Sequence, residues 1–82
     1  MRDEVLKYQR IRNLRIDNNL TQTEVASYLN IKQNTYSQYE IGVLNYPLDV
    51  VIQLARFYNT SVDYLVELTD DPRPYARSGK QP

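Results

Sequence analysis

The sequence predicts an all-α fold, a bundle of five short helices, and three observations support this prediction. Apolar residues recur three and four positions apart in five separate segments, as they do in helices with one buried face. Residues that start or stop helices stand between these segments. The chain has 82 residues, which allow one domain with a small core.

The composition argues against several classes of protein. The chain contains neither Cys nor His, so it lacks the residues of disulfides, thiolate metal sites and the usual catalytic centres. We therefore expect no enzyme, no metal and no cofactor. No apolar run approaches the roughly 20 residues that span a membrane, and the first residues lack the apolar segment of a signal peptide. We expect a cytoplasmic protein.

Charge is balanced overall but unevenly distributed. Ten Lys and Arg residues match ten Asp and Glu residues, so the formal net charge is zero. Residues 1–17 carry five basic and three acidic side chains, whereas residues 47–71 carry Arg56 alone against five acidic side chains. We expect a mildly basic N-terminal helix and an acidic far end. Zero net charge predicts weak non-specific affinity for nucleic acid, because that affinity comes from neutralising phosphates.

The first predicted helix begins with Asp3 as its cap and ends near Asp17. Apolar residues follow at helical spacing, and they are Leu6, Ile11 and Leu14. The turn after this helix contains Asn18 and Asn19, and Leu20 anchors the turn to the core.

Residues 21–42 predict two short helices joined by a tight turn. The first begins with a capping box, in which the side chains of Thr21 and Glu24 each accept from the other's backbone N–H. Its apolar face contains Val25, Ala26 and Leu29. Asn30 suits the left-handed conformation of the turn, and Ile31 returns to the core. A second helix begins near Lys32.

In this second helix Tyr36 and Tyr39 lie three positions apart and face the core, and Gly42 ends the helix. Polar side chains occupy the opposite side, and they are Gln33, Asn34, Ser37 and Gln38. Side chains that both donate and accept hydrogen bonds are what base edges in a major groove require. The alternative is an ordinary solvated helix face.

Two further helices complete the predicted bundle. Tyr46 precedes Pro47 and is therefore disfavoured in a helix, so residues 43–46 form a loop and Pro47 lies in the first turn of the next helix. The inner face of that helix contains Leu48, Val51, Leu54, Ala55 and Tyr58. Ser61 caps the last helix, with Asp63 in its first turn, and its apolar face contains Val62, Leu65 and Leu68.

The composition changes after Leu68. Residues 69–82 hold three of the four prolines and few aliphatic side chains, so they bury too little apolar surface to offset the entropy of ordering. We predict a domain over residues 1–68 and a flexible tail over residues 69–82. A partner-binding arm around Pro72 to Tyr75 is the alternative.

Eight tyrosines raise the alternative of a protein that stacks the bases of single strands. Five of them lie on or beside the predicted apolar faces, and they are Tyr28, Tyr36, Tyr39, Tyr58 and Tyr64. We interpret most of these as core or rim residues whose hydroxyls reach water.

Residues 21–42 resemble the helix-turn-helix of the XRE family, the DNA-binding domains of the Cro and CI type of phage repressor. The matching positions are Gln22, Val25, Ala26, Ile31, Ser37, Gln38, Tyr39, Glu40 and Gly42. The likeness continues through Pro47, Leu54, Ala55 and the segment from Ser61 to Leu65, so it covers roughly residues 5–68. It implies a lambda-repressor-like DNA-binding domain.

The resemblance also implies roles for single residues. The residues expected at base edges are Gln33, Asn34, Ser37 and Gln38. Those expected at phosphates are Gln22, Lys32, Thr35, Tyr39, Asn45, Tyr46 and Arg15. In the family, the Arg that matches Arg15 bonds the Glu that matches Glu40. Such a pair orients two helices more than it stabilises them. The alternative for Arg15 and Glu40 is two unrelated surface charges.

We therefore predict a sequence-specific regulator of transcription that binds double-stranded DNA, a repressor of bacterial, phage or mobile-element origin. We expect a homodimer on a palindromic operator, because one recognition helix buries little surface, and no small-molecule effector is evident. Two surfaces are candidates for the dimer contact, the last helix and the apolar loop at Ile41, Val43 and Leu44. The alternatives are a protein-interaction module of the same fold and the antitoxin of a toxin–antitoxin pair.

Overall fold

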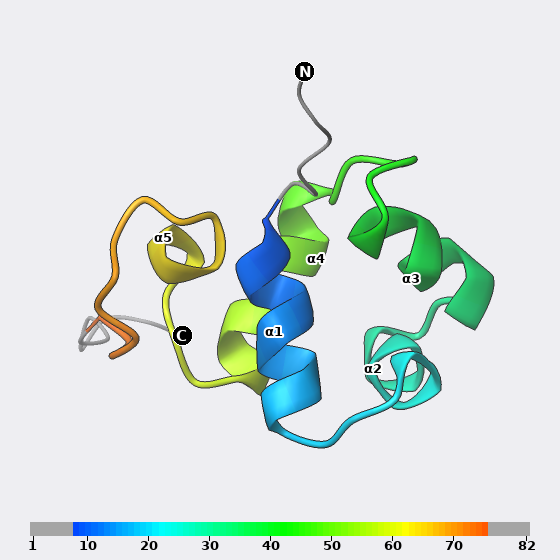
Figure 1. The fold of residues 1–82 in the computed structure, drawn as a ribbon, viewed down its shortest axis with the longest axis horizontal. Coiled ribbons are helices and arrows are strands. Elements are labelled where there is room, and N and C mark those ends of the chain that lie inside the picture. The colour runs from blue at the N-terminus through cyan, green and yellow to red at the C-terminus, as the bar shows by residue number, and fades with distance from the viewer. Residues whose placement is uncertain (1–7, 76–82) are drawn as a thin grey trace.

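The computed structural model describes residues 8–75, and in this part of the chain every regular element is a helix (Figure 1). The helices are α1 (Gln9–Asp17), α2 (Gln22–Leu29), α3 (Gln33–Glu40), α4 (Leu48–Phe57) and α5 (Val62–Leu65). In Figure 1 α1 crosses the middle of the molecule, with α2 and α3 on its right and α5 on its left. The predicted all-α class with five helices is confirmed.

Every helix contributes at least one fully buried apolar side chain to a single core. The buried residues are Ile11, Val25, Ala26, Leu29, Tyr36, Tyr39, Val50, Val51, Leu54, Ala55 and Leu65. Burying one large aliphatic side chain stabilises a fold by about 1.5 to 3 kcal/mol. Because most of these residues lie at the predicted helical spacing, hydrophobic periodicity accounts for the packing of the bundle.

Two predicted core residues are exposed instead. Leu48 is 69% exposed, because the helix begins at Leu48 with Pro47 as its N-cap, and Val50 takes the inner position. Leu68 is 76% exposed. Helix α5 ends at Leu65 and Glu67 adopts a left-handed φ of 67°, so Leu68 falls outside the helical register.

Helix α1 ends at Asp17 as predicted but begins only at Gln9. Tyr8 precedes it with a left-handed φ of 54°, so the described helix does not continue through that residue. The predicted cap Asp3 and the apolar Leu6 lie outside the described residues.

Local hydrogen bonds fix the start of α2 and the turn between α2 and α3, as predicted. The Thr21 hydroxyl accepts from the Glu24 N–H at 3.0 Å, and the Glu24 carboxylate accepts from the Thr21 N–H at 2.8 Å. Asn30 has a left-handed φ of 60°, and the Ile31 N–H bonds the Ala26 carbonyl at 3.0 Å. The capping box starts α2, whereas the turn at Asn30 ends it and sets the angle at which α3 leaves it.

The end of α3 differs slightly from the prediction. The helix ends at Glu40, Ile41 is its C-cap, and Gly42 follows with a left-handed φ of 86°. No atom lies within 4 Å of the place where a Gly42 Cβ would stand. Glycine is therefore favoured here by backbone conformation and not by close packing.

Arg10 ties the segment after α5 to α1. Its guanidinium donates to the carbonyl oxygens of Tyr64 at 3.0 Å and Thr69 at 2.7 Å. It also pairs with the Asp70 carboxylate at 3.0 Å and lies 4.3 Å from the centre of the Tyr64 ring. A planar guanidinium can make all of these contacts at once, which a lysine cannot.

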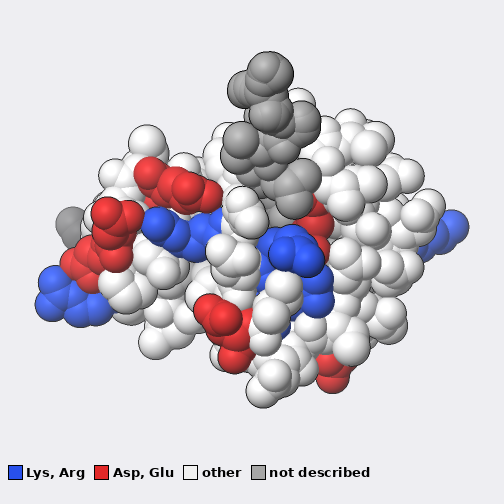
Figure 2. Space-filling model, in the orientation of Figure 1, with Lys and Arg blue, Asp and Glu red and all other residues white. Residues whose placement is uncertain are grey.

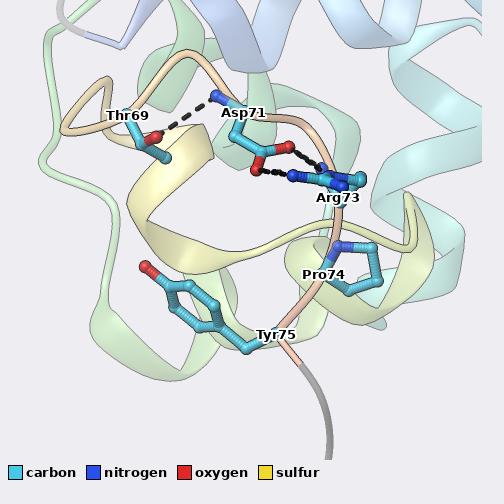
Figure 3. Close-up of a pocket in the computed structure, with 5 residues that line it drawn as sticks. All are labelled: Thr69, Asp71, Arg73, Pro74 and Tyr75. Atoms are coloured by element: carbon cyan, nitrogen blue, oxygen red, sulfur yellow. Dashed lines mark hydrogen bonds and ion pairs between the residues drawn. The ribbon is translucent and has the colours of Figure 1, made fainter.

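Residues 69–75 also contact the rest of the bundle. The Thr60 hydroxyl donates to the Pro72 carbonyl at 2.6 Å, and the Tyr75 hydroxyl bonds the Asp63 carboxylate. An open pocket in this segment is lined by Thr69, Asp71, Arg73, Pro74 and Tyr75 (Figure 3). Residues 76–82 lie outside the described part of the chain, so the boundary between domain and flexible tail stays a prediction.

We expect Arg10→Ala to lower the free energy of unfolding by about 1 to 3 kcal/mol, because it leaves two partly buried carbonyls without this donor. Arg10→Lys should recover only part of this loss. Arg12→Ala removes the same charge from the same helix and is the matched control. Urea unfolding of the four proteins measures the effect, and an equal loss in Arg12→Ala would show that the contacts of Arg10 contribute nothing.

Candidate nucleic-acid interface

Helix α3 buries one side and presents a polar surface on the other. Tyr36, Tyr39 and Glu40 are at most 9% exposed. The residues predicted at base edges lie on the opposite side, where Gln33 and Asn34 are exposed and Ser37 and Gln38 are half-buried. The helical period therefore brings the four polar side chains together on one accessible face.

The residues predicted at phosphates are more scattered. Lys32 and Asn45 are exposed at the two ends of the α3 region, and Thr35 is half-buried. Tyr39 is only 9% exposed. The Tyr46 hydroxyl is buried, so the predicted contact of Tyr46 with a phosphate does not fit this placement.

Arg15 and Glu40, which the resemblance pairs, form a bidentate ion pair between α1 and α3. Arg15 Nε donates to Glu40 Oε2 at 2.8 Å, and a terminal guanidinium nitrogen donates to Oε1 at 3.1 Å. The other terminal nitrogen donates to the Leu20 carbonyl at 2.9 Å. The side chains are 13% and 1% exposed, so the pair is almost completely shielded from water.

Both members of this pair stay charged near neutral pH. Burial alone would raise the pKa of Glu40, but the hydrogen bond from Arg15 and the nearby Tyr36 and Gln22 outweigh burial and lower it. The hydrogen bond to Glu40 raises the pKa of Arg15 against the opposing effect of burial. A buried negative charge at the end of α3 is thus a fixed feature of the site.

A chain of hydrogen bonds leads from this charge to the surface of α3. Gln22 Nε2 donates to Glu40 Oε1 at 3.1 Å, and Gln33 Nε2 donates to Gln22 Oε1 at 2.7 Å. An ionised carboxylate can only accept hydrogen bonds, so the Gln22 amide must present its nitrogen to Glu40 and its oxygen to Gln33. The charge of Glu40 therefore sets the orientation of both glutamine amides.

This orientation determines what Gln33 offers to a ligand. One N–H of its amide is used on Gln22, which leaves one N–H donor and the carbonyl acceptor for an outside partner. A donor and an acceptor side by side match the major-groove edge of adenine. Gln22, the first residue of α2, adds a backbone N–H at a helix N-terminus, a position that favours anions.

Charge is sparse on this side of the molecule. Glu40 is the only charged residue within α3, and it is buried. In Figure 2 acidic side chains gather over α5 and the segment after it, on the left, whereas the visible surface over α2 and α3 is largely uncharged. The predicted acidic far end is therefore present, and it lies away from α3.

Three buried tyrosine hydroxyls were not expected from the sequence. Within residues 8–75 the hydroxyls of Tyr36, Tyr46 and Tyr58 are buried and make no hydrogen bond. Burial and the charge of Glu40 raise the pKa of all three, that of Tyr58 to about 12. For Tyr36 and Tyr58 the prediction that the hydroxyl reaches water is wrong. The place of a residue on an apolar helix face does not show whether its hydroxyl is buried or exposed.

Between residues 8 and 75, no group of three or more metal-ligating side chains is placed to hold a metal ion. None of the five helices described is long and apolar enough to cross a membrane.

Comparison with known proteins identifies a family and several relatives of this chain. A family model described as helix-turn-helix matches residues 11–65. The chain is 44% identical over 66 residues to YobD of Bacillus subtilis (strain 168), an uncharacterized HTH-type transcriptional regulator, covering 80% of this chain and 59% of that protein. It is 40% identical over 57 residues to RstR of Vibrio cholerae, a cryptic phage CTXphi transcriptional repressor, covering 70% of this chain and 51% of that protein.

A third relative is ImmR of Bacillus subtilis (strain 168), an HTH-type transcriptional regulator that is 36% identical over 58 residues, covering 71% of this chain and 46% of that protein. The chain thus spans about half the length of the curated relatives it matches. No solved structure matches it significantly.

The buried ion pair predicts a specific dependence of stability on pH. Because folding lowers the pKa of Glu40 below its ordinary value of 4.5, the stability it contributes is present above that pH and is lost as pH falls through the folded-state pKa. Glu40→Gln keeps the shape and removes the charge, and near pH 7 it should be less stable by roughly 3 kcal/mol.

Urea unfolding of both proteins at a series of pH values measures this effect. We expect the gap between them to narrow as pH falls below 4.5. Other carboxylates titrate in both proteins and cancel from the difference. A gap that stays constant down to about pH 3 would mean that the Glu40 charge does not contribute.

Proposed function

The chain belongs to the helix-turn-helix family, and we propose that it is a sequence-specific transcriptional regulator that binds double-stranded DNA with α3 in the major groove. The observation that carries this proposal is the fixed orientation of Gln33, which leaves one donor and one acceptor facing outward. An amide held in this way can recognise a base edge without first losing its side-chain freedom.

The rest of the surface supports the same docking. Asn34, Ser37 and Gln38 lie on the accessible side of α3 with Gln33, within reach of neighbouring base pairs. The N-terminus of α2 would then meet the DNA backbone through the N–H groups of its first turn. Lys32, exposed at the N-cap of α3, adds a positive charge for a phosphate.

The low charge of this surface determines which contacts would supply the affinity for DNA. Non-specific affinity for DNA comes mainly from cations that neutralise phosphates. Because α3 carries no basic residue and the net charge is zero, we propose that affinity depends more on base contacts than is usual. We further propose that the protein represses transcription in the cytoplasm, by analogy with the phage repressor among its relatives.

We propose that the protein binds as a homodimer to a palindromic operator. An exposed apolar group follows α3 and includes Ile41, Val43, Leu44 and Leu48, which are 54%, 65%, 41% and 69% exposed. Exposed apolar groups of this kind mark contacts with other proteins. A two-fold axis at this surface would direct two copies of α3 at the same face of the duplex, as paired half-sites about 34 Å apart require.

The same apolar group favours a second candidate function. A protein-interaction module of the same fold would use these side chains to bind another protein, and zero net charge would not hinder it. A gel shift against random duplexes, followed by selection of the bound sequences, separates the two functions. A regulator enriches one sequence, whereas an interaction module enriches none.

Substitutions on α3 test the proposal at residue level. Gln33→Ala and Gln38→Ala should each weaken binding to the selected duplex by about 1 to 3 kcal/mol, because each removes a base contact. Binding to a scrambled duplex and the melting temperature should stay nearly unchanged. Gln9→Ala, an exposed glutamine on α1, is the matched control. If the selected duplex binds all of these proteins equally, α3 does not recognise bases.

Charge substitutions on the exposed apolar group test the dimer. Val43→Asp together with Leu48→Asp should convert dimer to monomer in sedimentation, because two buried carboxylates without partners are strongly unfavourable. Leu68→Asp is the control, since Leu68 is equally exposed but lies beside α5. If Leu68→Asp alone dissociates the dimer, the dimer contact lies at α5. A wild-type protein that is monomeric even on DNA would contradict the homodimer.

A further inference from the structure

The interior of the bundle contains a polar cluster that the proposed DNA contacts do not use. The hydroxyls of Tyr36 in α3, Tyr46 in the loop before α4 and Tyr58 at the end of α4 are all buried. None of the three makes a hydrogen bond within residues 8–75. A buried hydroxyl without a partner is destabilising, so three such groups in one small core need an explanation.

The Glu40 carboxylate has room for one more donor. An ionised carboxylate offers about four acceptor positions on its two oxygens. Two are occupied by Arg15 and one by Gln22. With the side chain 1% exposed, water from outside does not reach the remaining position. A neighbouring hydroxyl is the natural donor for it.

Tyr36 is the hydroxyl best placed to be this donor. It lies four positions before Glu40 on α3, so one helical turn places both side chains on the buried face of this helix. No hydrogen bond of ordinary geometry joins them in the structure. The Tyr46 hydroxyl is buried as well, and Tyr46 packs against the same buried face of α3. Tyr46 is held there by ring contacts, 5.3 Å between centroids to Tyr39 and 6.2 Å to Tyr8.

We propose that Tyr36 donates to Glu40 and Tyr46 donates to Tyr36, and that this buried chain positions Gln22 and, through it, Gln33 for contact with DNA. The effect on Gln33 and DNA rests on the proposed function, whereas the hydrogen bonds of Tyr36 and Tyr46 do not. Tyr36 and Tyr46 are positioning residues, since neither reaches the surface where DNA would bind.

The physical basis is the limited freedom of the carboxylate. With all of its acceptor positions occupied, Glu40 cannot rotate without breaking a bond, so Oε1 stays directed at Gln22. The Gln22 amide then stays directed at Gln33. Loss of the Tyr36 hydroxyl frees one position, so Glu40 can rotate and release Gln22. Gln33 would then sample orientations that do not match a base edge.

The hydrogen bonds can be tested without DNA. In Tyr36→Phe and Tyr46→Phe we expect the side-chain amide resonances of Gln22 and Gln33 to shift in a ¹⁵N–¹H spectrum of the folded protein. Tyr28→Phe makes the same chemical change on an exposed residue of α2, whose ring stacks on Phe57, and should leave these resonances in place. If Tyr36→Phe also leaves them in place, its hydroxyl is not part of the chain.

The effect on recognition is tested with duplexes. Tyr36→Phe should reduce the preference for the selected sequence over one altered at the base pair contacted by Gln33, by roughly three- to tenfold. In a Gln22→Ala background the same substitution should have no further effect, because the path through Gln22 is already broken.

The outcomes separate the possible failures. An equal loss of affinity for all duplexes would indicate a purely structural role for Tyr36 and overturn the proposal. If the wild-type protein selects no sequence, the proposed function fails, and the resonances of Gln22 and Gln33 still decide whether the buried chain exists.

Discussion

The buried ion pair of Arg15 and Glu40 is the constraint on which the rest of this small fold depends. It joins α1 to α3, and its two partners also bond the Leu20 carbonyl in the first turn and the Gln22 amide at the start of α2. One charge pair therefore connects three helices and a turn. Buried pairs of this kind add little net stability, since desolvation opposes the attraction, but they allow few arrangements of the groups around them. Here the arrangement that they allow extends to the surface of α3.

Much of the fold could be predicted from the sequence, because most of its signals are local. The capping box at Thr21 and the left-handed turn at Asn30 depend on a few neighbouring residues, and both were predicted correctly. The errors at Leu48 and Leu68 lie at helix ends, because Leu48 is the first residue of α4 and Leu68 lies three residues beyond the end of α5. At a helix end a side chain no longer has to follow the buried face of the helix, and no local pattern shows where that change occurs.

The candidate site could be predicted only in part. The polar face of α3 follows from residue spacing, and the resemblance to a family added roles for single residues. What the sequence could not show is which side chains meet across the fold. Glu40 lies 25 positions from Arg15, and this pair was predicted from the family resemblance and not from spacing. The contact of Glu40 with Gln22, 18 positions away, was not predicted, and Tyr46, whose hydroxyl is buried, was predicted to contact a phosphate. Such contacts depend on how the helices pack, which periodicity does not encode.

The nearly uncharged surface of α3 has a consequence for how the protein would search a chromosome. A protein with a strongly basic surface spends most of its time on random sequence, held there by phosphates. With few cations beside α3, this protein would leave random sequence quickly and move through solution between encounters. A larger fraction of its copies would then be free at any moment, and a small number of molecules per cell would suffice to keep one operator occupied.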